Sequence, residues 1–97
     1  MNHFAVVVTV KLKPGMADQF RPHILKNAAA SKDSEPDCHR FDVLVVEEDA
    51  DTIIFYEEYT DAAAFETHHQ TAHYKAFRQA TDDMVLDKQI ARCGVIS

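Results

Sequence analysis

The sequence has no tryptophan, only two glycines and three prolines, and no low-complexity stretch among its 97 residues. With so few glycines and prolines, the sequence contains no segment that would serve as a linker between two domains. No apolar run is long enough to span a bilayer, and the residues after Met1 lack the basic start and the cleavage site of a secretory signal. We therefore predict one cytoplasmic domain over residues 1–97, with no membrane partner.

Cysteine and positive charge are also scarce. The two cysteines, Cys38 and Cys93, are too few and too far apart for a disulfide scaffold, and their spacing fits no zinc site. The formal net charge is −6, and there is no run of lysine or arginine. Nucleic acid is therefore excluded as a partner. A hydrophobic share of 46% is nevertheless enough for a folded core.

Two kinds of hydrophobic pattern alternate along the chain. Apolar, β-branched runs predict strands, and repeats of about 3.6 residues predict helices. Thr60 or Asp61 is the expected N-cap of the second helix, and Thr71 is the expected cap where this helix breaks and restarts. The predicted strands are 4–12, 39–48, 52–59 and 88–96, a turn lies at 49–51, and the predicted helices are 16–31 and about 62–83.

This order, β-α-β-β-α-β, is that of a ferredoxin-like α+β fold with two helices on one face of a four-stranded antiparallel sheet. The opposite face should be apolar, since Ala5 and Val7 point there from the first strand. A second copy of the chain is the simplest cover, so we predict a homodimer. Pro22 requires the first helix to kink or to start late.

Polar residues on the buried face of the first helix are candidate ligand contacts. Asn27 and Ser31 continue the stripe that Phe20 and Ile24 begin. A buried polar group without a hydrogen bond costs about 1–3 kcal/mol. Asn27 therefore either ties the helix to a neighbouring segment or points into a ligand pocket, and the sequence favours neither.

Carboxylates and histidines supply candidate acid–base groups. Glu57 shares a strand face with Phe55 and Tyr59, so we expect it to be partly buried and to have a perturbed pKa, whereas Glu58 fits a rim position. Three histidines, His68, His69 and His73, fall within six residues. His68 leans toward the core. Their spacing matches no common metal motif, and we expect His69, like His23, to lie on a solvated helix surface.

Three stretches of the sequence resemble the antibiotic biosynthesis monooxygenase (ABM) family. They are NAAASKDSEPDCHRFDV at 27–43, YEEYTD at 56–61 and FETHHQTAHYKAF at 65–77. The resemblance implies a homodimeric ferredoxin-like fold with a pocket between sheet and helices. Its members include cofactor-free monooxygenases of phenols and quinols, haem-degrading enzymes and an isomerase of phosphorylated autoinducer-2. The lack of tryptophan argues against haem breakdown, and Asp37 replaces the usual glycine.

The resemblance implies a cofactor-independent monooxygenase that acts with O₂ on a small phenolic, quinol or enolisable substrate, with no cofactor and no metal. His68 is the expected base, oriented by Glu57. The expected substrate-binding residues are Asn27, Ser31, Tyr59, His73 and Phe41. Two alternatives stay open: an isomerase of a small hydroxyketone, whose phosphate could meet Arg40, Lys75 or Arg78, and a non-catalytic ligand-binding dimer.

Overall fold

The computed structural model describes residues 3–97 and contains the elements that the sequence predicts, in the same order. The second predicted helix is divided in two by a break, which confirms the expected restart. The elements are β1 (Phe4–Leu12), α1 (Ala17–Ser34), β2 (Cys38–Val46), β3 (Asp49–Tyr59), α2 (Ala62–His68), α3 (Ala72–Thr81), a 3₁₀ turn (Asp82–Met84) and β4 (Val85–Gly94).

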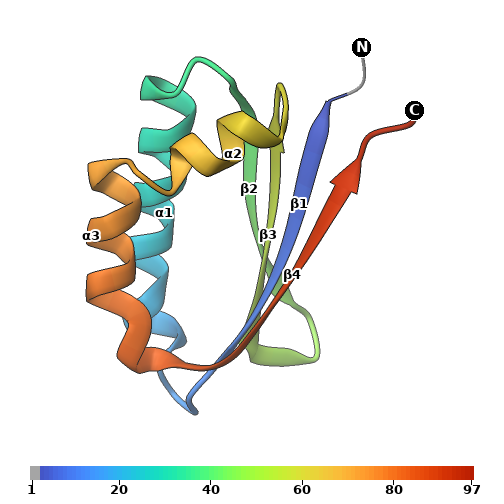
Figure 1. Ribbon diagram of the computed structural model, residues 1–97. Coiled ribbons are helices and arrows are strands. Elements are labelled where there is room, and N and C mark those ends of the chain that lie inside the picture. Colours follow the sequence, from blue (N-terminus) through green and yellow to red (C-terminus); the bar gives the residue numbers. More distant parts are fainter. Residues whose placement is uncertain (1–2) are drawn as a thin grey trace.

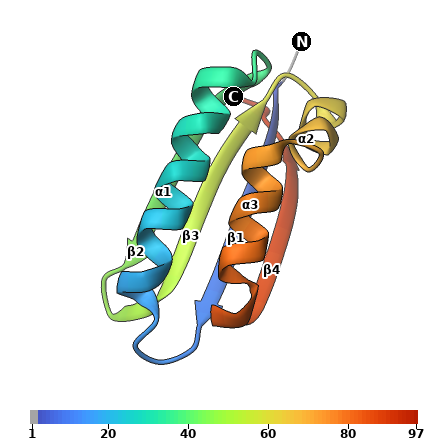
Figure 2. The ribbon, with the colours of Figure 1, turned by 90° about the vertical axis from the view of Figure 1, so that its left-hand side faces the viewer.

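The four strands form one antiparallel sheet in the order β2-β3-β1-β4, which confirms the ferredoxin-like α+β class. The three α-helices of residues 3–97 lie on one side of this sheet, and the start of β1 and the end of β4 lie at the same end of the molecule (Figure 1). Figure 2 shows α1 and α3 running side by side over the sheet, with α2 beyond the end of α3. The site described below lies in this layer, between sheet and helices.

The helices form where the sequence predicts them because their caps and buried stripes agree. The stripe on α1 is buried as expected, and Phe20 packs against the rings of Phe55 and Phe77. Asp61 accepts a hydrogen bond from the backbone N–H of Ala64 at 2.9 Å and caps α2. Thr71 accepts one from Tyr74 at 3.2 Å and caps α3. These two caps fix the bend that carries the histidines.

Several predicted boundaries are wrong by a few residues. Of the two effects predicted for Pro22, the late start is not observed, since α1 begins at Ala17. Pro22 removes one backbone hydrogen bond at an exposed position near the start of the helix. The β2–β3 turn lies at 47–48 rather than 49–51, because strand pairing continues to the Val46–Asp49 pair. The first helix extends to Ser34, and the last strand is Val85–Gly94.

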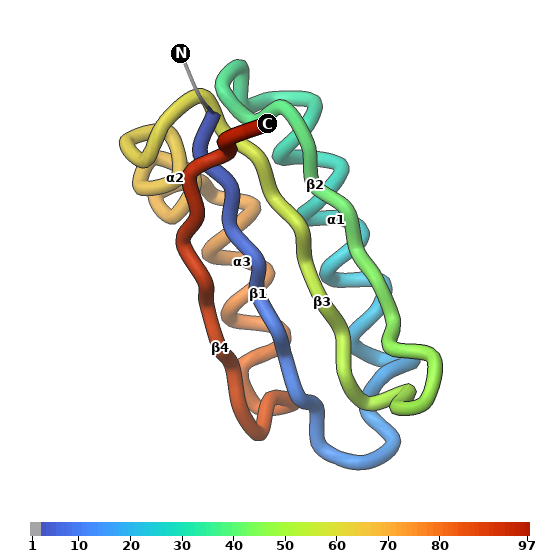
Figure 3. The backbone as a smooth tube through the Cα atoms, turned by 90° about the vertical axis from the view of Figure 1, so that its right-hand side faces the viewer, coloured from blue at the N-terminus to red at the C-terminus, as the bar shows by residue number. Residues whose placement is uncertain are grey.

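Within residues 3–97, no helix covers the other face of the sheet, here called the open face (Figure 3). Tyr56, Val7 and Ala91 are direct neighbours across three strands on this face, and Leu44, beside Ile54, is 50% exposed. The open face is therefore apolar in its middle, as the sequence predicts. None of the helices within residues 3–97 has both the length and the apolar character needed to cross a membrane.

Candidate active site

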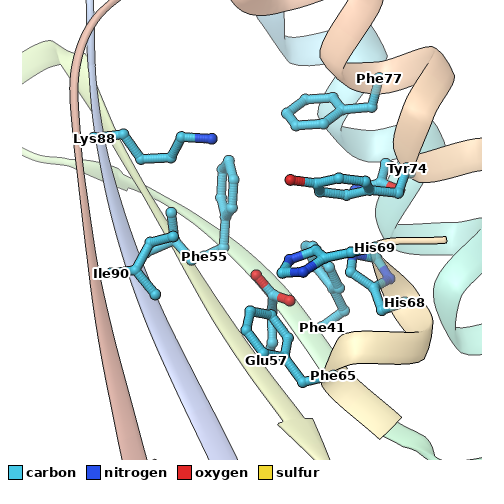
Figure 4. A pocket seen from close by; sticks show the side chains of 12 residues that line it. Phe41, Phe55, Glu57, Phe65, His68, His69, Tyr74, Phe77, Lys88 and Ile90 are labelled. Carbon is cyan, nitrogen blue, oxygen red and sulfur yellow. The ribbon is translucent and has the colours of Figure 1, made fainter. Parts of the chain in front are cut away.

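A small pocket of about 30 Å³, open to solvent at its mouth, lies between the helix layer and the sheet. Aromatic rings form most of its wall, and a few polar groups project into it (Figure 4). This combination is typical of small-molecule sites. The lining residues are Val8, Asn27, Phe41, Phe55, Glu57, Phe65, His68, His69, Tyr74, Phe77, Lys88 and Ile90.

Glu57 is the buried carboxyl of this pocket. Its position on β3, opposite Val6 and Phe41, turns the side chain toward the helices, where it is only 3% exposed. Burial raises the pKa of Glu57 to about 7, although a hydrogen bond from Tyr59 opposes the shift. That bond joins Tyr59 Oη to Glu57 Oε1 at 2.6 Å. A carboxyl with this pKa can accept a proton and return it near neutral pH.

Tyr59 fixes the Glu57 carboxyl through its hydrogen bond. The tyrosine is fully buried, and burial together with the nearby charge of Glu57 raises the pKa of its phenol far above the ordinary value. The phenol therefore keeps its proton and acts only as a hydrogen-bond donor. This bond fixes one carboxyl oxygen and leaves the other, Oε2, available to a molecule in the pocket.

His68 ends α2 and reaches the pocket from the helix side. Its side chain is 2% exposed, and its Nδ1 lies 2.8 Å from Oε2 of Glu35 and 3.5 Å from Oγ of Ser31. Burial lowers the pKa of His68, and the Glu35 charge opposes this. A neutral ring that donates Nδ1–H to Glu35 keeps Nε2 unprotonated, and Nε2 has no hydrogen-bond partner within residues 3–97.

The carboxylate that orients His68 is thus Glu35, and the prediction that Glu57 does so is wrong. Glu35 lies just after α1, where the chain turns toward β2 and passes the end of α2. The same Oε2 atom also contacts Nε2 of His73 at 2.6 Å. The three donor atoms lie within 4.8 Å of one another, so this cluster could hold a metal ion. The hydrogen bonds from His68 and His73 also satisfy the Glu35 carboxylate when no metal ion is bound.

Asn27 projects from α1 into the pocket. It is 3% exposed, and its Oδ1 has no hydrogen-bond partner within residues 3–97. Buried polar atoms are seldom left without a partner, and an exception asks for an explanation such as an absent ligand. Of the two interpretations that the sequence left open, a tie through Oδ1 to a neighbouring segment is not observed.

Comparison with known proteins agrees with this architecture. The family model described as "Antibiotic biosynthesis monooxygenase" matches residues 3–80, which is most of the chain. The chain belongs to the antibiotic biosynthesis monooxygenase family. The resemblance of the three sequence stretches to this family is thereby confirmed. No curated protein matches the chain in sequence.

Solved structures of proposed ABM proteins share the fold at low sequence identity. One from Nitrosomonas europaea is 24% identical, with a TM-score of 0.93 over 97% of this chain and 90% of that one. One from Caulobacter crescentus is 24% identical, with a TM-score of 0.92 over 99% and 92%. One from Bacteroides thetaiotaomicron is 20% identical, with a TM-score of 0.92 over 99% and 91%. Family and fold together support a general monooxygenase-like function.

Four of the seven predicted site residues of this ABM protein line the pocket, namely Asn27, Phe41, Glu57 and His68. The other three lie behind them and contact the wall residues or their partners. Ser31 Oγ donates a hydrogen bond to the backbone carbonyl of Asn27 at 2.7 Å. Tyr59 donates one to Glu57, and His73 forms one with Glu35. Substrate contact by these three residues stays a prediction.

Eight of the twelve wall residues were not among the predicted site residues, and three of these eight carry polar groups: His69, Tyr74 and Lys88. His69 was expected on a solvated surface, but its ring packs on Phe65 and Tyr74 at centroid distances of 4.4 and 4.7 Å. Burial lowers the pKa of His69. The bend after α2 turns this residue inward, and a continuous helical repeat does not reveal that. The sequence could have indicated Lys88, because Lys88 and Ile90 are two residues apart in β4 and therefore point to the same face of the sheet.

Proposed function

We propose that this ABM protein is a cofactor-independent monooxygenase of a small phenolic, quinol or enolisable substrate. The observation that carries the proposal is a buried carboxyl with a pKa of about 7 in an aromatic pocket that also holds an unpartnered amide oxygen. A base with this pKa is suited to take a proton from a substrate hydroxyl at neutral pH. The surrounding rings exclude water from the anion that forms.

The proposed reaction begins with proton transfer from a substrate hydroxyl to Glu57. The unprotonated Nε2 of His68 accepts a hydrogen bond from a second hydroxyl, and Asn27 fixes the substrate through its carboxamide. For a hydroquinone, the ring supplies all four electrons that reduce O₂. One oxygen atom forms a new C–O bond and the other leaves as water, so hydroquinone and O₂ give hydroxybenzoquinone and water. The substrate is the only reductant, so the balance requires no bound redox cofactor.

Oxygen labelling tests this proposal. With methylhydroquinone at pH 7 under ¹⁸O₂, we expect protein-dependent oxygen uptake and one ¹⁸O atom in the quinone product, after subtraction of the rate without protein. Oxygen uptake that yields unlabelled quinone and hydrogen peroxide would contradict monooxygenation. Turnover or deuterium exchange of a hydroxyketone under argon, with no oxygen uptake on any quinol, would instead support the isomerase alternative. If neither occurs, the ligand-binding alternative replaces both.

We propose that the open face is covered by a second copy of the chain. The support is the apolar row of Val7, Tyr56 and Ala91 at the centre of a face that no helix of the described residues shields. Val7→Glu should convert a dimer into a monomer, because two buried carboxylates per interface would lack partners. Sedimentation equilibrium measures the mass. The same change at exposed Val45, on the helix side of β2, is the control. A monomeric natural chain at micromolar concentration would overturn this proposal.

A further inference from the structure

Lys88 differs from every other cationic side chain of the molecule. Of the ten lysine and arginine residues, all within residues 3–97, only Arg78 and Lys88 are shielded from solvent in part, and the rest are exposed. Arg78 donates to Asp82 at 2.7 Å and to Tyr74 at 2.8 Å. Lys88 makes no ion pair and no hydrogen bond within the described residues. The carboxylates of Asp82 and Glu57 act on the Lys88 charge from a distance, but a partly buried ammonium without a direct ion-pair partner is an unusual arrangement.

The sheet register directs this side chain into the pocket. Lys88 lies directly opposite Val10, which faces the helices and is 2% exposed, so both project from the same face of the sheet. Figure 4 shows the ammonium group extending between Phe55 and Phe77, toward Tyr74. Burial lowers the pKa of Lys88, and the nearby charge of Arg78 lowers it further.

Lys88 and Glu57 occupy different parts of one pocket. Their charges are near enough to influence each other's pKa, yet they form no ion pair. A ligand between them meets a proton acceptor at one place and a cation at another, with aromatic rings on both sides. A molecule with an ionisable hydroxyl and a separate anionic group would satisfy both.

We infer that the pocket selects aromatic hydroxy compounds that carry a carboxylate, and that Lys88 is the residue that binds this carboxylate. The inference rests on the proposed function and narrows its substrate class from neutral phenols and quinols to hydroxybenzoic acids. A charge-assisted hydrogen bond in a partly buried site contributes enough to change affinity by about tenfold or more. Phe55 and Phe77 line the pocket beside the ammonium, where an aromatic ring that carries the carboxylate can pack against them.

Calorimetric titration under argon tests this without turnover, with 2,5-dihydroxybenzoate and its methyl ester as probes of nearly equal shape. At pH 7 we expect the natural protein to bind the acid at least about tenfold more tightly than the ester. Lys88→Met should remove this preference and leave ester affinity within about threefold. Lys88→Arg should keep most of the preference, since it retains the positive charge. Lys13→Met, at an exposed position between β1 and α1, is the matched control.

Three results would overturn the inference. The first is that the natural protein does not bind the acid, the second is that it binds acid and ester with equal affinity, and the third is that Lys88→Met loses affinity for acid and ester by the same factor. Circular dichroism of each variant confirms that it is folded. The outcome is independent of the oxygen-labelling test. Preference for the acid without any oxygen uptake refutes the proposed reaction alone, and turnover of neutral quinols with no preference for the acid refutes the role of Lys88 alone.

Discussion

Glu57→Gln is expected to lower kcat for quinol oxidation by about 10²–10⁴-fold, the range that a positioned general base contributes. The amide has nearly the same shape and can still accept the hydrogen bond from Tyr59, so packing around the site is retained. What is lost is the ability to take a proton. KM should change little, because the amide still occupies the same wall of the pocket.

The pH profile identifies the cause of this loss. A general base works in its deprotonated form, so log(kcat/KM) of the natural protein should rise with pH and level off above an inflection near 7, the pKa of buried Glu57. Glu57→Gln should lack that inflection. Glu48→Gln, the same change at the exposed β2–β3 turn, is the control and should keep both rate and profile. An inflection near 7 that persists in Glu57→Gln would assign the base to another group, His68 being the next candidate.

The same substitution is expected to stabilise the protein, increasingly so as the pH rises. Burial raises the Glu57 pKa from 4.5 to about 7, so between these values the folded chain holds a proton that the unfolded chain has released. The Glu57 contribution to the free energy of unfolding is therefore fully favourable below pH 4.5 and is lost as the pH rises through 7. One pKa unit corresponds to about 1.4 kcal/mol, so the loss is about 3 kcal/mol in total.

Urea denaturation of both proteins at pH 5, 6, 7 and 8 measures this effect. The difference in unfolding free energy between Glu57→Gln and the natural chain should grow with pH by about 3 kcal/mol and then remain constant above pH 7. Taking the difference cancels the other titrating groups, including His68, whose lowered pKa acts in the opposite direction. A constant difference across the range would show that Glu57 titrates normally. A more stable but inactive variant would show that the buried carboxyl is retained for chemistry.

A metal ion held by Glu35, His68 and His73 would use the same atoms that position His68 in the proposed reaction. Glu35 Oε2 contacts both imidazoles, and His68 keeps its second nitrogen available only while Nδ1 donates to that carboxylate. In the proposed reaction Glu35 is therefore a positioning residue: it acts on the tautomer of His68 and does not line the pocket.

Much of the molecule follows from local sequence. Alternation and the 3.6-residue repeat determined the order of strands and helices, the buried stripe of α1 with Asn27 in it, and the burial of Glu57, because each periodicity fixes which face of an element is inside. Side-chain caps at Asp61 and Thr71 fixed the helix starts for the same local reason.

Only the tertiary structure decided which of these groups meet. Glu35 contacts His68 across 33 positions of sequence because the loop after α1 passes the end of α2, and no periodicity encodes the path of a loop. His69 and Lys88 line the same pocket although they are 19 positions apart, because the bend between α2 and α3 packs over the sheet that contains β4. Faces are set by residues close in sequence, whereas contacts between elements depend on how whole elements pack.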